Sequence, residues 1–257
     1  MTTETSNRPA FCTFKHNGNP HRIFPVPRKA VNASKFTNSY KSTVSNPLTI
    51  GISPQRTFDP IPLGGQPNIV ALEVKVEFAA GTTQAKQDQV MGYAALWSEH
   101  AFVDFTTVGN GPVRITVAFD PQDGNSTILL GGIAIVNIGA LANPTNNELR
   151  RDVLHEFGHA LGLMHEHQNP NSNFQWDEQA VKDWYQVNEP IMDEATVILN
   201  ILTPVANAAV ATAADPDSIM AYHIPLELTV NGTSSAPNMV LSDGDKQAIR
   251  LLYLGRP

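Results

Sequence analysis

The sequence predicts an α+β fold, with strands and helices before about residue 162 and mainly helical or irregular structure after it. Apolar residues alternate with polar ones over residues 72–78 and 113–119, which is the period of half-buried strands. Over residues 84–100 and 145–161 they instead recur every three or four positions, which is the period of helices. Both periods occur before residue 162, in the sheet-bearing half, and after Gly162 the pattern changes to helices and loops.

The first 60 residues differ from the rest of the chain. They are rich in Pro, Asn, Ser, Thr and Lys and carry only short apolar patches, which predicts an irregular extension. Residues 60–65 (Pro-Ile-Pro-Leu-Gly-Gly) punctuate the chain and mark the start of the main domain. The first strand of that domain is residues 72–78, where Leu, Val, Val and Phe alternate with charged residues.

The sheet-bearing half continues with one helix and three more strands. Val90, Tyr93, Ala94 and Trp97 recur at helical spacing and predict an amphipathic helix over residues 84–100. The predicted strands and the loop between them follow, at residues 102–107 (strand), 113–119 (strand), 120–127 (polar, turn-rich loop) and 132–138 (apolar strand).

The next helix begins at Thr145, which forms a capping-box pattern with Glu148. An apolar stripe at every fourth position can face the sheet; it consists of Leu149, Val153, Phe157 and Leu161. After Gly162 we expect helices at about 176–187 and 190–202, an ambiguous Ala-rich stretch at 206–214 and a turn at 215–217. A C-terminal helix begins at the capping-box pattern Ser242-x-x-Asp245 and carries Ala248, Ile249 and Leu252.

The predicted helix carries a metal-binding pattern. Residues 155–165 read H-E-x-x-H-x-x-G-x-x-H. His155 and His159 lie one turn apart on one helix face, where two imidazoles can hold one ion. Gly162 lets the helix stop and the chain turn, so that His165 can return as a third ligand. Three protein ligands with one open position are typical of a catalytic zinc site, and Glu156 is placed to take a proton from a zinc-bound water.

This motif resembles that of the metzincin zinc metallopeptidases. Residues 218–222 (Ser-Ile-Met-Ala-Tyr) are similar to the Met-turn of that clan in its astacin-like form, found in bacterial and fungal relatives, which ends in tyrosine. The resemblance covers about residues 66–257. It implies a twisted mixed sheet with helices in an upper half, a mainly helical or irregular lower half, and an active-site cleft between them.

The resemblance also implies roles for individual residues. Met220 would form an apolar floor beneath one zinc ion per chain, and Tyr222 would donate a hydrogen bond to the oxyanion of the reaction. Glu156 would act as general base in an endopeptidase. The substrate would be a protein or peptide, extended along an edge strand that we predict at residues 132–137, with Gly132, Ile133, Ala134 and Ile135 as binding residues.

Two features depart from the astacin pattern. Astacins continue their motif with H-E-x-x-R, whereas here Glu166 is followed by His167, Gln168 and Asn169. Astacins also carry disulfides, whereas Cys12 is the only cysteine of this chain. We therefore do not assign Glu166 as the anchor of a processed N-terminus, and we do not assign His167 as a ligand.

The resemblance implies a function for each predicted part of the chain. We predict a catalytic domain at residues 61–257, with an upper half at 61–162 and a lower half at 163–257. Residues 1–60 are a passive extension or an inhibitory pro-segment. In the second case Cys12 is a candidate zymogen switch, because a thiolate binds zinc well.

Composition limits the partners. The net charge is −7 and the chain has no basic cluster, which argues against nucleic acid or an anionic membrane as a partner. No apolar run is long enough for a membrane span. We expect a monomer. The resemblance favours secretion, although the first residues lack the basic start and apolar run of a signal peptide.

The main prediction is a zinc-dependent endopeptidase that hydrolyses peptide bonds with a metal-activated water. An alternative is a degenerate relative that binds zinc and acts only as a non-proteolytic interaction module. A third interpretation is a latent enzyme held inactive by its own first 60 residues, which differs from the first only in regulation.

Overall fold

The computed structural model describes residues 12–15, 71–109, 113–121, 124–130, 133–139, 143–188, 192–205 and 213–253. The strands are β1 (Cys12–Lys15), β2 (Leu72–Phe78), β3 (Val103–Thr106), β4 (Val113–Ala118), β5 (Asn125–Leu130) and β6 (Ile133–Ile138). The α-helices are α2 (Gln84–Ser98), α3 (Asn146–Ala160), α4 (Glu178–Asn188), α5 (Glu194–Val197) and α6 (Asp243–Tyr253). Short 3₁₀ turns lie at η2 (Glu166–Gln168) and η4 (Leu226–Leu228), and η3 (Ile198–Leu202) is a π-helical turn. The predicted α+β class is confirmed.

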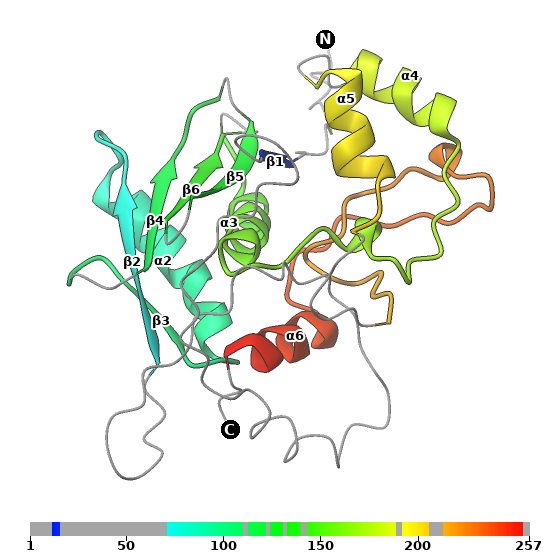
Figure 1. Cartoon of the computed structure of the whole chain (residues 1–257). Helices are drawn as coiled ribbons and strands as arrows, with labels where there is room; N and C mark the ends of the chain where they lie inside the picture. Colours follow the sequence, from blue (N-terminus) through cyan, green and yellow to red (C-terminus); the bar gives the residue numbers. More distant parts are fainter. Residues whose placement is uncertain are drawn as a thin grey trace, which may run out of the picture.

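The six strands form one mixed sheet in the order β1-β5-β6-β4-β2-β3. Strands β3, β2, β4 and β6 are parallel to one another, and β5 runs antiparallel to β6. Strand β1 pairs in parallel with the outer edge of β5, with Cys12 opposite Asn125. In Figure 1, helices α2 and α3 lie against the sheet, while α4 and α5 belong to a separate group of helices and loops.

Two sequence-based expectations about the strands are wrong. The predicted loop at residues 120–127 ends too late, because β5 begins at Asn125. Asn125, Ser126 and Thr127 are polar and suggest a turn, yet all three are buried. The predicted edge strand at 132–137 is also wrong, because β6 lies between β5 and β4 and both of its edges are paired.

The assignment of substrate-binding residues changes with this topology. Gly132 lies outside the described residues. Ile133 and Ile135 are exposed on one face of the sheet, and Ala134 is buried in the core. Since the backbone of β6 is already paired on both sides, it has no free edge to offer a peptide.

The main core lies between the sheet and helices α2, α3 and α6. Val74, Val76 and Ile115 on the strands pack with Trp97 and Phe157 on the helices. The indole Nε1 of Trp97 also donates a hydrogen bond to the carbonyl of Leu154, 3.1 Å away. This packing holds α3, the helix with the histidine motif, rigidly against the sheet.

Helix α3 approaches its neighbours most closely at Gly158. A Cβ atom built at this position would lie 2.5 Å from the sulfur of Met220 and 3.3 Å from a ring carbon of Trp97. Both of those side chains are fully buried, so neither can move easily into solvent. Glycine is therefore needed at Gly158 because of close packing and not because of its backbone freedom.

Replacing Gly158 by alanine is expected to destabilise the fold. The matched control is Gly92→Ala, at an exposed position inside helix α2 with nothing within 4 Å of a new Cβ. Both variants gain the same helix propensity, so their difference isolates overpacking, which costs about 1–3 kcal/mol. Thermal unfolding should therefore show Gly158→Ala less stable than Gly92→Ala by about this amount. Equal stabilities would show that Met220 and Trp97 repack freely.

The lower half has its own smaller core. Val181 and Tyr185 of α4 pack with Val197, Ile201 and the ring of Tyr222. The predicted helix at 190–202 is shorter than expected, because α5 begins at residue 194 and gives way to a π-helical turn. The predicted helix at 176–187 is confirmed within a few residues as α4.

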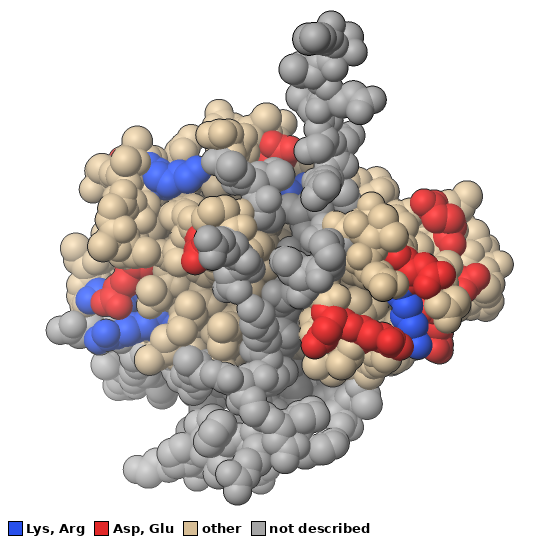
Figure 2. All heavy atoms as spheres, turned by 90° about the horizontal axis from the view of Figure 1, so that it is seen from above, with Lys and Arg blue, Asp and Glu red and all other residues tan. Residues whose placement is uncertain are grey.

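Charge on the surface is mainly acidic over the end of the molecule formed by α4 and α5 (Figure 2). The exposed acidic residues there are Glu178, Asp183, Asp193 and Glu194, with Lys182 paired to Glu194 at 3.0 Å. No helix in the described ranges has the length and apolar character needed to cross a membrane.

Candidate active site

Helix α3 places the first two histidines. Its start is fixed by the predicted capping box, in which Thr145 and Glu148 bond reciprocally to each other's backbone. Its end is a Schellman turn, in which the amide of Leu163 donates to the carbonyl of Gly158 and the amide of Gly162 to that of His159. Gly162 has a φ of 101°, which only glycine adopts without strain. The turn then directs the chain back toward the helix.

The three histidines of the motif converge, as predicted. The Nε2 atom of His159 lies 3.1 Å from that of His155 and 2.9 Å from that of His165. All three side chains are buried. Burial lowers the pKa of His155 to about 4 and lowers the pKa of His159 and His165 well below the usual range. The three imidazoles are therefore neutral at pH 7, which is the state that binds a metal ion.

The outer nitrogens of the same imidazoles are held by acceptors. His155 Nδ1 lies 2.8 Å from the carbonyl of Ile219, and His159 Nδ1 lies 2.8 Å from the carbonyl of Leu163. A carbonyl only accepts, so both Nδ1 atoms carry the proton and both Nε2 lone pairs face the common point. This donor set suits a metal ion, and a cluster of three imidazoles is the type of site that zinc occupies.

Glu156 is held by strand β5. The hydroxyl of Thr127 donates to Oε2 of Glu156 at 2.6 Å, and both side chains are fully buried. A charged carboxylate accepts such a bond strongly, so Thr127 fixes the direction in which Glu156 points. The first residues of β5 look like a turn in the sequence because they are polar. The polar side chain of Thr127 is needed there because β5 lies beside α3.

The segment with Met220 is held by the carboxylate of Asp245 in α6. Asp245 accepts hydrogen bonds from the hydroxyl of Ser218 at 2.7 Å and from the amide of Ile219 at 2.8 Å. Asp245 is also the partner of Ser242 in the predicted capping box of α6. The carbonyl of Ile219 then holds His155. One carboxylate in the last described helix therefore supports a histidine of α3 through the backbone of a single residue, Ile219.

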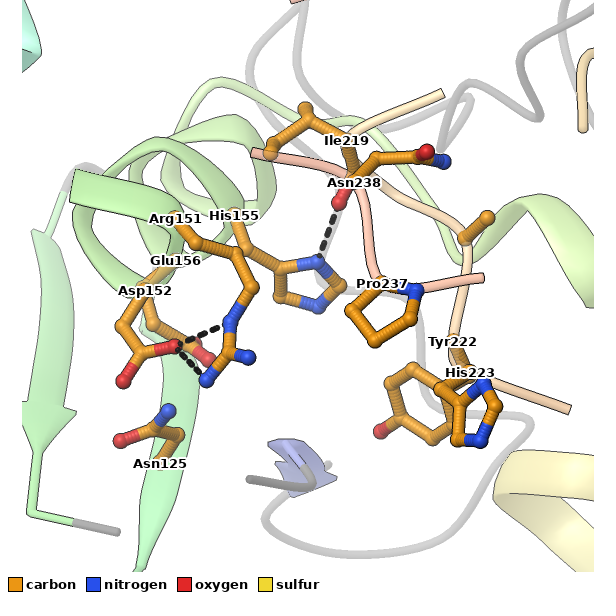
Figure 3. A pocket seen from close by; sticks show the side chains of 11 residues that line it. Asn125, Arg151, Asp152, His155, Glu156, Ile219, Tyr222, His223, Pro237 and Asn238 are labelled. Carbon is orange, nitrogen blue, oxygen red and sulfur yellow. Dashed lines mark hydrogen bonds and ion pairs between the residues drawn. The ribbon is translucent and has the colours of Figure 1, made fainter. Parts of the chain in front are cut away.

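A pocket opens beside these residues, and Figure 3 shows its lining. Helix α3 contributes Arg151, Asp152, His155 and Glu156, and the lower half contributes Ile219, Ala221, Tyr222, His223, Pro237 and Asn238, with Asn125 from β5. Glu156 and Tyr222, the two catalytic candidates, thus line one pocket. The pocket lies between the two halves of the chain.

Some pocket residues were not predicted from the sequence. Arg151 and Asp152 form an ion pair, with Nη2 of Arg151 2.8 Å from Oδ1 of Asp152. They precede His155 by four and three positions, so helical spacing places them on its face and was the available signal. Pro237 and Asn238 come from a loop whose sequence gives no such signal.

The remaining candidates have different outcomes. His167 is buried, and its ring packs against the rings of both His165 and Tyr222, with centroids 5.1 and 4.5 Å away. Burial raises the pKa of Glu166 to about 8. Cys12 lies in β1, where only the backbone is described, so its role as a switch remains a prediction.

The chain was compared with known protein families, curated proteins and solved structures. The sequence matches no family model, and no curated protein matches it. A solved structure of myroilysin matches with 31% identity, over 72% of this chain and 94% of that one, with a TM-score of 0.62.

High choriolytic enzyme 1, a hatching-enzyme zinc-protease from the medaka fish Oryzias latipes, matches with 17% identity over 72% of this chain and 91% of that one. Its TM-score is 0.54, so this match bears on the fold alone. The match to myroilysin and the three convergent histidines together place this chain in the astacin-like branch of the metzincin zinc metallopeptidases.

Proposed function

We propose that the protein is a zinc endopeptidase, with one zinc ion per chain held by His155, His159 and His165. The observation that carries the proposal is the convergence of three neutral imidazoles in a pocket that also contains Glu156 and Tyr222. A bound zinc ion would supply Lewis acidity and would lower the pKa of a water to about 7.

The residues of the chain supply the remaining chemistry. Glu156, oriented by Thr127, takes a proton from the attacking water and delivers it to the leaving amine nitrogen. Tyr222 donates a hydrogen bond to the oxyanion that develops on the scissile carbonyl. Met220 lies under helix α3 at Gly158 and provides an apolar support for the ligands.

We propose that the substrate binds along β5 rather than β6. Thr127 of β5 touches Glu156, so this strand passes beside the site. A peptide paired with its outer edge would therefore cross the site in an extended form. In this structure β1 occupies that edge, which supports the proposal that residues 1–60 are an inhibitory pro-segment of the catalytic domain at 61–257.

The proposal is tested by metal analysis and by digestion of a peptide library read by mass spectrometry. We expect about one zinc per chain, cleavage at internal peptide bonds, loss of cleavage with a chelator such as 1,10-phenanthroline, and recovery on adding zinc. A protein that binds zinc and cleaves nothing, even without residues 1–60, would instead be a non-proteolytic interaction module. Absence of zinc binding would remove the site assignment itself.

A further inference from the structure

The three histidines differ in what holds their outer nitrogens. Backbone carbonyls hold Nδ1 of His155 and of His159. Nδ1 of His165 instead faces a side chain, with Oε1 of Gln168 3.2 Å away. Backbone acceptors persist under any substitution, whereas a side-chain acceptor depends on the residue present. The third histidine is therefore the one whose geometry a single side chain can set.

The amide of Gln168 can take only one orientation. Its Nε2 lies 2.8 Å from the carbonyl of Leu199 and 2.8 Å from the carbonyl of Thr203. Carbonyls only accept, so the NH₂ group must face them and Oε1 is left to face His165. His165 must then carry its proton on Nδ1 and present the lone pair of Nε2 to the metal. Gln168 is buried, so water does not compete readily for these bonds.

The side-chain amide of Gln168 replaces a backbone donor that is missing at a proline. In the π-helical turn η3 the amide of Thr203 donates to the carbonyl of Ile198, five residues earlier. The carbonyl of Leu199 would pair in the same way with residue 204, but Pro204 has no N–H group. Gln168 supplies the missing donor. Its own backbone carbonyl also accepts from the amide of Val205, which fixes it to the same segment.

We propose that Gln168 is a positioning residue for the third zinc ligand. It sets the tautomer and ring orientation of His165, and it connects that histidine to the end of the turn at residues 198–202. This inference rests on the proposed zinc site. Gln168 bonds to Leu199 and Thr203, more than thirty positions further along the chain. Part of the metal affinity would therefore depend on the π-helical turn in which Leu199 lies.

The test compares two variants of similar size. Gln168→Met removes the acceptor for His165 and both donors, whereas Gln168→Glu removes the donors and keeps an acceptor. Loss of such an outer hydrogen bond weakens metal binding about 10- to 100-fold. Competition with a zinc chelator should therefore show this loss in Gln168→Met and an affinity closer to wild type in Gln168→Glu. The visible spectrum of the Co²⁺-loaded protein should change in Gln168→Met.

A second substitution separates the zinc ligand from the helix end. Pro204→Ala restores an N–H group beside the carbonyl of Leu199 without touching His165. Added to Gln168→Met, it should recover thermal stability of the metal-free protein and leave zinc affinity low. Recovery of both together would overturn the proposal, because Gln168 would then act only as a cap of the turn. Wild-type affinity in Gln168→Met would overturn it as well.

A measurement on the wild-type protein needs no variant and remains decisive if the variants fail to fold. Nitrogen-15 NMR of the imidazoles should show the Nδ1–H tautomer of His165 in the metal-free protein. The Nε2–H tautomer would contradict the proposed role of Gln168. Wild-type protein that binds no zinc would refute the zinc site together with this inference, whereas zinc binding with the wrong tautomer would refute the inference alone.

Discussion

Glu156→Gln is expected to keep the metal and lose peptide hydrolysis, with kcat falling about 10²- to 10⁴-fold. The amide has the same shape and can still accept the hydrogen bond from Thr127, so the fold should not change. It cannot take a proton from water at neutral pH. The three histidines that converge on the metal are untouched. Zinc content should therefore match wild type while the rate of peptide cleavage falls.

The matched control for this variant lies on the same helix. Glu148→Gln changes the capping box of α3, where glutamine can replace glutamate, so activity and stability should stay close to wild type. Retention of full activity by Glu156→Gln would show that another group moves the proton. Loss of zinc along with activity would show that Glu156 acts through the metal site and not as a base.

A chain that begins at residue 61 is expected to cleave peptides at lower substrate concentrations than the full chain. In the full chain β1 pairs with β5 along Cys12–Lys15 and so occupies the edge that we propose for the substrate. Two backbone hydrogen bonds at about 1 kcal/mol each would favour the closed form about thirtyfold. Because the competition is for binding, KM should fall by about tenfold or more while kcat stays the same.

A full-length variant provides the control for this truncation. Thr13→Pro combined with Phe14→Pro removes two amide donors from β1 and should disrupt its pairing without shortening the chain. Circular dichroism and zinc content would verify that each protein is folded. A folded truncation with unchanged KM and kcat would identify residues 1–60 as a passive extension, and the structural pairing of β1 would then have no regulatory meaning.

The sequence predicted the centre of the site well because its signals there are local. The capping box at Thr145, the four-residue spacing of His155 and His159, and the glycine at Gly162 each act within a few residues. Features that depend on local hydrogen bonds and helix geometry could therefore be predicted from the sequence alone. The Met-turn segment was found by resemblance, and the structure places Met220 beneath α3.

The errors arose where pairing over long distances decides the structure. An apolar run such as residues 133–138 indicates a buried strand, but it does not say which strands lie beside it. Strand β5 was missed because its first residues are polar, and one of them, Thr127, is used to hydrogen-bond Glu156. Gln168 gave no sign either, since its partners at Leu199 and Thr203 are distant in the sequence.

The hydrogen bonds from Ser218 and Ile219 to Asp245 have a consequence for when the metal site can assemble during synthesis. The ribosome releases His155, His159 and His165 well before Asp245, yet Asp245 binds the amide of Ile219, the residue whose carbonyl holds His155. A nascent chain therefore carries all three ligands while the first of them still lacks its support. Assembly of the complete metal site has to wait until helix α6 has been synthesised and has docked.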